Sequence, residues 1–215
     1  MATASHFSLT EGIIAAPGEI QSLEVAPTAL GVEVRVWLRA DRSQALSARR
    51  RTLAGPTGCG LCGVDSLAEA MRAPSVVGEG LSLRSADVHR ALASLPDAQA
   101  LGGRTHAVHA AAWWTPDGGL VAVREDVGRH NALDKLAGAL ARAGVGPASG
   151  VLLLTSRVSV EMVQKAAMFG AQALVAVSAP TALAVRTATA AGLTLIAVAR
   201  DDSFEVFTRP DRVVG

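Results

Sequence analysis

The chain has 215 residues, half of them hydrophobic, and a formal net charge of +1 at pH 7. This length can bury one substantial core, or one core and a small lobe. The near-neutral charge argues against a nucleic-acid binder that neutralises many phosphates, and no apolar run is long enough to cross a bilayer. The first residues lack a signal-peptide pattern, and two cysteines fit a reducing compartment, so we expect a cytoplasmic protein without nucleic-acid or membrane partners.

The first hundred residues predict a smaller, partly β lobe. Two partly alternating stretches, 20–25 and 32–38, are separated by Pro27 and Gly31, which is typical of a hairpin. Helices are expected over 41–51, 64–71 and 86–95. Ser85 is the expected N-cap of the last of these helices, and Pro96 ends it.

A glycine-flanked pair of cysteines lies between the first two of these helices. The segment GCGLCG at 58–63 holds Cys59 and Cys62, which are the only cysteines of the chain. Glycine lets the backbone turn and removes side chains that block approach. The segment therefore favours thiols that meet another molecule over two ordinary buried cysteines.

Four interpretations of this pair stay open on the residues alone. A closed zinc site needs four ligands, and no second Cys-x-x-Cys or paired-histidine spacing supplies the other two. A thioredoxin-type switch normally opens a helix directly after a strand, whereas a basic run and a loop precede Cys59. A mobile thiol that carries a sulfur atom or an acyl group is the third interpretation, and two structural cysteines are the fourth.

Strands and helices alternate from residue 106 onward. The expected strands cover 106–114, 120–124, 151–155, 173–178, 193–199 and 205–208, and the expected helices cover 131–143, 159–170 and 181–191. Three of the strands are continuous apolar runs, as in strands buried on both faces. The alternation predicts an α/β fold with a largely parallel sheet between helices, a three-layer α/β/α domain at 103–215 that follows the smaller lobe at 1–102.

Polar residues follow the expected strands of this domain, at the ends where such sheets bind ligands. Ser156, Arg157 and Ser159 follow one strand, and Ser178 and Thr181 follow the next. Hydroxyls, a guanidinium and the free N–H groups of the following helices all suit an anion. One such loop would be explained by N-caps alone, but three in succession favour a ligand that carries phosphates. No Walker or G-x-G-x-x-G spacing indicates a nucleotide hydrolase or a dinucleotide dehydrogenase.

The third of these loops is a dense polar cluster at 124–135, around Gly128. Helical spacing places His130 and Asp134 on one face, and a histidine backed by a carboxylate can handle protons. The same residues also suit a capped helix start with a solvated face. The residues alone leave both interpretations open.

Four motifs in the chain occur together in one known family. They are TGCGLCG at 57–63, REDVGRHNALDK at 124–135, SRVS with EMVQK at 156–165, and VSAPT at 177–181. In this order and spacing they resemble the formate dehydrogenase accessory sulfurtransferases, the FdhD family. The resemblance runs from about residue 7 to the C-terminus, and family members usually begin with several dozen further residues, so the N-terminus looks shortened.

The resemblance implies a sulfurtransferase with a cysteine persulfide intermediate. Family members take sulfur from a cysteine desulfurase and pass it to the molybdenum or tungsten of bis-molybdopterin guanine dinucleotide. The cofactor then goes to the formate dehydrogenase catalytic subunit. By this resemblance Cys59 carries the sulfur, Cys62 assists, the cofactor is bound as cargo, no structural metal is expected, and the protein forms a homodimer. The second domain is expected to be similar to the cytidine deaminase fold, although the zinc-deaminase signature is absent.

The resemblance also implies a binding site for the cofactor. Its expected residues are Val198, Ala199, Arg200, Asp201, Asp202 and Ser203 near the C-terminus, with Ser156, Arg157, Ser159, Ser178, Thr181, Arg129 and His130. The neighbouring acidic side chains of Asp201 and Asp202 leave backbone contact as the alternative for that segment. A non-catalytic cofactor-binding chaperone and a thiol-disulfide oxidoreductase remain the alternative functions.

Overall fold

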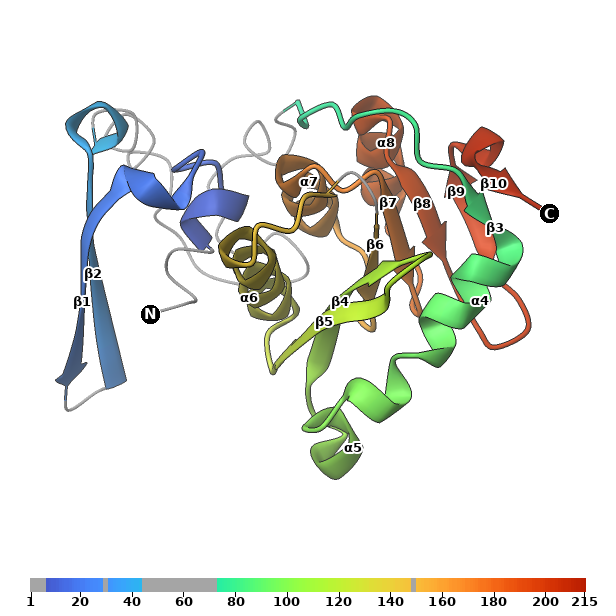
Figure 1. Cartoon of the computed structure of the whole chain (residues 1–215), viewed down its shortest axis with the longest axis horizontal. Helices are drawn as coiled ribbons and strands as arrows, with labels where there is room; N and C mark the ends of the chain where they lie inside the picture. Colours follow the sequence, from blue (N-terminus) through green and yellow to red (C-terminus); the bar gives the residue numbers. More distant parts are fainter. Residues whose placement is uncertain (1–6, 29–30, 44–72, 148–149) are drawn as a thin grey trace.

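The computed structural model describes residues 7–28, 31–43, 73–147 and 150–215 of the chain (Figure 1). The Cys-x-x-Cys loop and the helix expected at 64–71 lie outside these ranges, as does most of the helix expected at 41–51. What the sequence predicts for Cys59 and Cys62 therefore stays a prediction.

A six-stranded sheet forms the centre of the described structure, in the order β5-β4-β6-β7-β8-β9. Its strands are β4 (His109–Thr115), β5 (Gly119–Asp126), β6 (Val151–Leu154), β7 (Ala173–Ala176), β8 (Thr194–Ala197) and β9 (Glu205–Thr208). β6, β7 and β8 run parallel, whereas β4 is antiparallel to both of its neighbours and β9 is antiparallel to β8. The prediction of a largely parallel sheet is wrong outside the three central strands, because short connections return the chain directly after β4 and β8, which only antiparallel pairs allow.

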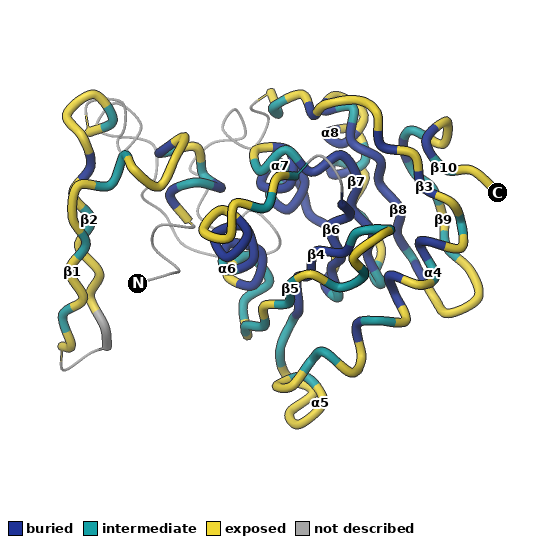
Figure 2. Tube along the Cα trace, in the orientation of Figure 1, coloured by how far each residue is buried: buried dark blue, intermediate teal, exposed yellow. Residues whose placement is uncertain are grey.

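Helices cover both faces of this sheet. α6 (Arg129–Arg142), α7 (Val160–Phe169) and α8 (Ala182–Ala191) lie on one face, and α4 (Ser85–Ala93) lies on the other (Figure 1). Successive side chains of a strand point to opposite faces, so Leu152 and Leu154 pack with the three helices, whereas Val151 and Leu153 pack on the side of α4. The strands are buried throughout their centre (Figure 2). The predicted α/β class is confirmed, and the likeness to cytidine deaminases stays a prediction.

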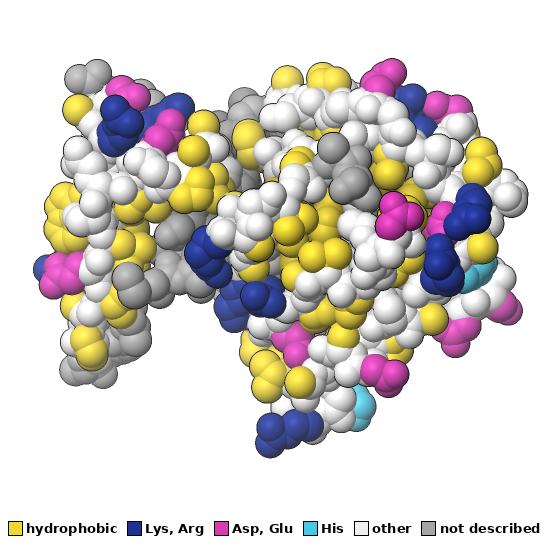
Figure 3. Space-filling model, viewed as in Figure 1, with side chains coloured by type: hydrophobic (Ala, Val, Ile, Leu, Met, Phe, Trp, Pro, Cys, Tyr) yellow, Lys and Arg dark blue, Asp and Glu magenta, His cyan; other side chains and the backbone are white. Residues whose placement is uncertain are grey.

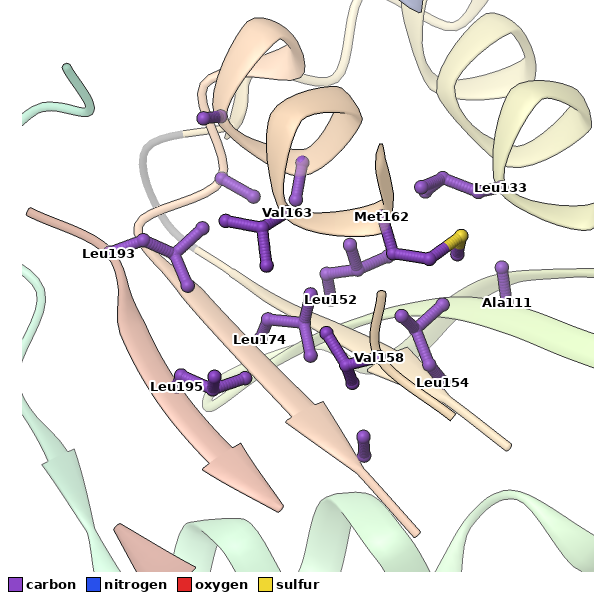
Figure 4. Close-up of a cluster of buried hydrophobic side chains, with 14 of the residues drawn as sticks. Ala111, Leu133, Leu152, Leu154, Val158, Met162, Val163, Leu174, Leu193 and Leu195 are labelled. Atoms are coloured by element: carbon purple, nitrogen blue, oxygen red, sulfur yellow. The ribbon is translucent and has the colours of Figure 1, made fainter. Parts of the chain in front are cut away.

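The core between the sheet and helices α6 to α8 is mostly aliphatic (Figure 4), with Trp113 as a fully buried aromatic member. Leu133 and Met162 extend from the helices toward Leu152 and Leu174 of the sheet, and all four side chains are fully buried. Each fully buried side chain of this kind stabilises the fold by about 1.5–3 kcal/mol. This packing fixes the first turns of α6 and α7 beside the carboxyl ends of the parallel strands.

Two consecutive β-α-β units position the strand ends. β6, α7, β7, α8 and β8 follow one another in the chain, and right-handed crossovers place both helices on the same face. α7 ends at Gly170 and α8 ends at Gly192, with φ of 88° and 66°, a left-handed conformation that favours glycine. Each helix thus returns the chain to the amino edge of the sheet, and the carboxyl ends of all three parallel strands share the opposite edge.

A hairpin of β1 (Ile20–Thr28) and β2 (Gly31–Leu38) projects away from the sheet (Figure 1). It confirms the hairpin predicted around Pro27. Val25 and Val34 face each other across the two strands, and both are exposed. Figure 3 shows hydrophobic side chains along this hairpin. A two-stranded hairpin is marginally stable by itself in water, so the hairpin depends on its attachment to the rest of the chain.

The segment before residue 102 also contributes to the sheet domain. β3 (Leu83–Arg84) pairs with β10 (Val213–Val214), and α4 packs in the same core as β4 and β6. The N-cap of α4 is Arg84 rather than the predicted Ser85, because the Asp87 carboxylate accepts the Arg84 backbone N–H at 3.3 Å. The division at residue 102 stays a prediction. The remaining described elements are η1 (Pro17–Glu19), η3 (Pro96–Ala98), α5 (Gly102–Thr105) and η5 (Pro210–Arg212).

Candidate functional site

The loops that follow β6 and β7 are held together by backbone hydrogen bonds. The Val158 N–H donates to the Ala179 carbonyl at 3.3 Å, and the Thr181 N–H donates to the Val158 carbonyl at 2.9 Å. The Ser178 hydroxyl lies 3.5 Å from the Thr155 carbonyl oxygen. The structure therefore brings the predicted residues of these two loops, Ser156, Arg157, Ser159, Ser178 and Thr181, to one edge of the sheet.

The predicted segment 198–203 continues this edge after β8. The Val198 N–H donates to the Ser178 carbonyl at 3.4 Å, and the Ala199 N–H donates to the Ala176 carbonyl at 3.1 Å. Val198 has φ of 52°, which is uncommon for a β-branched residue, and strained residues of this kind tend to cluster at ligand sites. The segment lies next to the loop after β7, as a shared binding site requires.

Side chains of the segment 198–203 mostly bond to the segment itself or to β7. The Arg200 guanidinium donates to the carbonyls of Val177 and Ala199 at 2.6 and 2.9 Å. The Ser203 hydroxyl donates to the Asp202 carboxylate at 2.9 Å, and Asp201 and Asp202 are exposed. Arg200 thus holds the strand end in place, and the two acidic side chains favour contact with an anion through the backbone.

The guanidiniums of Arg129 and Arg157 act at the same edge, close to the first residue of the antiparallel strand β4. Because β4 runs against β6, its first residue, His109, lies at the carboxyl end of β6. Burial, and then the charges of Arg129 and Arg157, hold the pKa of His109 below its ordinary value. The two guanidiniums therefore act on the same place although they come from different loops. His109 also matches the pattern of the family that the sequence resembles, and that resemblance predicts that it lines the site.

The polar cluster before α6 divides into two parts. Asp126 accepts the Gly128 N–H at 2.9 Å and the Asn131 side-chain amide at 3.2 Å, and it forms an ion pair with Lys135. Burial raises the pKa of Asp126, but the Lys135, Gly128 and Asn131 contacts outweigh it and hold the pKa below its ordinary value. These residues hold the start of α6, whose N-cap is Gly128 and has no side-chain cap.

His130, in contrast, is not bonded to the carboxylate that helical spacing suggests. The Asp134 carboxylate accepts hydrogen bonds from the Thr10 hydroxyl at 2.5 Å and from the Lys165 ammonium at 3.0 Å. Burial, and then the charge of Arg129, hold the pKa of His130 below its ordinary value, while the charge of Glu161 acts in the opposite direction. No hydrogen bond between His130 and Asp134 is present among the described residues. The charge of Asp134 also acts on the pKa of His130, but the acidic neighbour with the larger effect is Glu161.

Several buried polar atoms in the first turns of α6 and α7 have no hydrogen-bond partner within the described ranges. They are Arg129 Nε, His130 Nε2, Ser159 Oγ and both carboxylate oxygens of Glu161, and we call them the unpartnered cluster. Ser159 is only 7% exposed and is the N-cap of α7, yet its hydroxyl makes no cap. Buried polar groups in folded proteins are nearly always hydrogen-bonded, so this cluster has the character of a ligand site.

Glu161 is the member of this cluster that the sequence analysis missed. It appears there only as part of EMVQK, where a glutamate near a helix start looks like an ordinary partner of the helix dipole. Nothing in the local pattern indicates that its carboxylate is buried without a partner. Among the described residues, no group of three or more His, Cys, Asp or Glu side chains could hold a metal ion.

The comparisons with known proteins agree with the motifs. A sequence profile of the FdhD/NarQ family matches residues 2–214. The chain belongs to this family. It is 52% identical over 209 residues to the sulfur carrier protein FdhD of Agrobacterium fabrum, which covers 97% of this chain and 77% of the relative. It is 47% identical over 207 residues to the protein of the same name from Cupriavidus necator, covering 96% and 72%.

A solved structure supports the family membership and the fold. The crystal structure of a formate dehydrogenase accessory protein from Desulfotalea psychrophila matches with a TM-score of 0.72 and 25% sequence identity. The match covers 99% of this chain and 79% of that chain. The resemblance predicted from the four motifs is thus confirmed. None of the described helices has the length and apolar character that a membrane span needs.

Proposed function

We propose that this FdhD-family chain is a sulfur carrier in the maturation of formate dehydrogenase. The observation that supports this most directly is its match to the family over residues 2–214, with curated relatives at about half identity that are named sulfur carrier proteins. The glycine-flanked pair of Cys59 and Cys62 supplies the chemistry, because a thiolate is the group that accepts sulfur. Cys59 is the proposed carrier and Cys62 the assistant.

The first step of this function is a thiol exchange with a cysteine desulfurase. The Cys59 thiolate attacks the outer sulfur of the persulfide on the desulfurase. A new S–S bond forms at Cys59 as the S–S bond on the desulfurase breaks, and the desulfurase cysteine leaves as a thiolate. The outer sulfur on Cys59 is then available for the metal of bis-molybdopterin guanine dinucleotide, which is the proposed cargo.

The sheet edge suits such a cargo. The cargo carries phosphates, and the edge offers the guanidiniums of Arg129 and Arg157 and the N-termini of α7 and α8. The segment 198–203 adds backbone groups beside them. Lys and Arg side chains also gather over α6 (Figure 3). Transfer to the formate dehydrogenase catalytic subunit, and a homodimeric assembly, belong to the same proposal.

The carrier role is tested by mass spectrometry of the full chain after incubation with a cysteine desulfurase and cysteine. We expect a persulfide adduct on Cys59 in the wild type and in Cys62→Ala. Cys59→Ala should lose the adduct and fail to support formate dehydrogenase maturation, while it still binds the cargo.

Other outcomes of this experiment would overturn the carrier role. A folded wild-type protein without an adduct on either cysteine would favour the cofactor-binding chaperone. A reversible disulfide between Cys59 and Cys62, together with reduction of insulin disulfides, would favour the thiol-disulfide oxidoreductase.

A further inference from the structure

Glu161 differs from the other shielded carboxylates of the described structure. The Asp134 carboxylate binds Thr10 and Lys165, and the Asp87 carboxylate binds Arg84 and Arg90. Neither oxygen of Glu161 has a hydrogen-bond partner within the described ranges, and both are shielded from solvent. A carboxylate left in this state costs the fold free energy, since a buried charged group without a hydrogen-bond partner is penalised more than a neutral one. A carboxylate kept at such a cost points to a ligand that donates two hydrogen bonds.

The neighbours of Glu161 indicate what else that ligand presents. His130 lies close enough for the charge of Glu161 to act on it, and its Nε2 has no hydrogen-bond partner among the described residues. The Ser159 hydroxyl and Arg129 Nε are also buried without a hydrogen-bond partner among the described residues. The site therefore combines a pair of acceptor oxygens with several groups that can bind an oxygen or a ring nitrogen. The charge of Arg129 acts on His130, and Arg129 and Arg157 both act on His109 at the same edge of the sheet, where their guanidiniums can bind phosphate.

The two oxygens of a carboxylate match two parallel N–H donors. A 2-amino-4-oxopyrimidine ring presents such a pair, because its ring N–H stands next to its exocyclic amino group. Adenine, cytosine and uracil have no two adjacent donors of this kind. Guanine and pterin rings both contain this edge, and the proposed cargo contains both rings.

We propose that Glu161 binds the 2-amino-4-oxopyrimidine edge of the cargo, with His130 and Ser159 bonding its remaining polar atoms. This assignment rests on the proposed cofactor-carrying function and makes Glu161 a specificity-determining residue. Solvent does not reach the Glu161 oxygens, so the ring enters only after covering groups move. Association is therefore expected to be slower than for an open site.

Calorimetric titration of the full-length chain with small probes tests the assignment. GDP and IDP differ only in the 2-amino group, and a biopterin and the corresponding lumazine differ in the same position. We expect the wild type to prefer the amino member of at least one of these pairs. Glu161→Gln should weaken binding of that probe by about ten- to a hundredfold and remove the preference, because one acceptor and the charge are lost.

A matched control uses the same chemical change at a distant glutamate. Glu79 lies beside Arg209 and Arg212, near the opposite end of β8, and its side chain is 81% exposed. Glu79→Gln should leave both preferences unchanged, and circular dichroism should show that both variants are folded. An effect on the GDP pair assigns the edge to guanine, and an effect on the pterin pair assigns it to the pterin.

Two outcomes would overturn the assignment, and they can be told apart. If the wild type prefers the amino probes and Glu161→Gln keeps that preference and affinity, only the role of Glu161 fails. If the wild type binds neither GDP nor the pterin, the cofactor-carrying function fails with it. Persulfide formation on Cys59 would be unaffected in both cases.

Discussion

Two neighbouring groups of polar side chains lie between α6 and α7, and they differ in their hydrogen bonding. In the first turns, His130 and Glu161 belong to the unpartnered cluster. One turn further along the same helices, Asp134 and Lys165 are bonded to each other and to Thr10, and both are buried. We call Thr10, Asp134 and Lys165 the bonded cluster. The same pair of helices thus carries the unpartnered cluster, whose polar atoms lack hydrogen-bond partners among the described residues, beside the bonded cluster, whose polar atoms are bonded to one another.

The difference between the two clusters separates stability from binding. Lys165 also forms an ion pair with Glu11 at 2.7 Å and lies 5.1 Å from the centre of the Phe7 ring. The bonded cluster therefore attaches the N-terminal segment to the helices. The unpartnered cluster makes no comparable attachment within the described residues. Changes in the bonded cluster should reduce stability, whereas changes in the unpartnered cluster should reduce ligand binding.

The largest effect is expected for Lys165→Met, which keeps the length of the side chain and removes its charge. Asp134 would then be a buried carboxylate without a cation. Such a change typically costs about 3–5 kcal/mol of unfolding free energy, which urea denaturation measures. Replacing Asp134 by leucine in the same chain should recover part of the loss, because both buried charges are then absent.

Glu161→Gln is the matched comparison for this prediction. Its unfolding free energy should not fall and is expected to rise, because no hydrogen bond of the described structure is lost and the charge of a buried, unpartnered carboxylate is removed. Equal losses in Lys165→Met and Glu161→Gln would contradict the distinction between the two clusters.

A smaller effect separates the two serine or threonine N-caps at the sheet edge. The Thr181 hydroxyl accepts the Ala184 N–H at 3.2 Å, whereas Ser159 makes no cap. Thr181→Ala should therefore lower the free energy of unfolding by about 1 kcal/mol. Ser159→Ala should leave it nearly unchanged and weaken binding of the preferred probe about three- to tenfold, since one hydrogen bond to the ligand is lost. A Ser159→Ala variant that loses as much stability as Thr181→Ala would show that Ser159 is a structural cap.

The strands of the sheet could be predicted where the sequence has continuous apolar runs, because such runs are typical of strands buried on both faces. β6, β7 and β8 are buried on both faces and lie where the sequence analysis placed them. β4, however, begins at His109 rather than at the predicted residue 106. The reason is that His106 adopts a left-handed conformation with φ of 51°, which ends α5. A histidine gives no sequence signal for that conformation, unlike a glycine. The turn at 116–119 predicts that β4 and β5 are joined directly, but the antiparallel pairing of β4 with β6 could not be predicted, since it depends on contacts between distant residues.

The site could be predicted in position but not in its bonding. Polar residues after buried strands indicated that these side chains share one edge of the sheet, because parallel strands end together, and the structure brings them to one edge. The partners of charged residues could not be predicted. Helical spacing suggests that Glu161 pairs with Lys165 four residues later. In the structure Lys165 instead forms ion pairs with Asp134 and Glu11, which are distant in sequence. Only the tertiary arrangement of α6, α7 and the N-terminal segment leaves the Glu161 carboxylate without a hydrogen-bond partner among the described residues.

The smallest expected effect is a pH dependence of stability that comes from His130. The folded protein holds the pKa of His130 below the ordinary value of 6.5, so the unfolded chain takes up the proton more readily. Stability therefore falls as the pH drops below about 6.5, and the fall ends once the pH is under the lowered pKa. Above about 7 both states are neutral at this residue, and it contributes no pH dependence.

His130→Gln removes this contribution without adding a charge. The decrease in unfolding free energy between pH 7 and pH 5 should be shallower in His130→Gln than in the wild type, as urea denaturation at each pH would show. His106→Asn is the matched control, because His106 is exposed and asparagine tolerates its left-handed backbone. The control should keep the wild-type slope. If His130→Gln also keeps it, burial does not hold the pKa of His130 below its ordinary value, and its Nε2 would be an unsuitable partner for the ring of the proposed cargo.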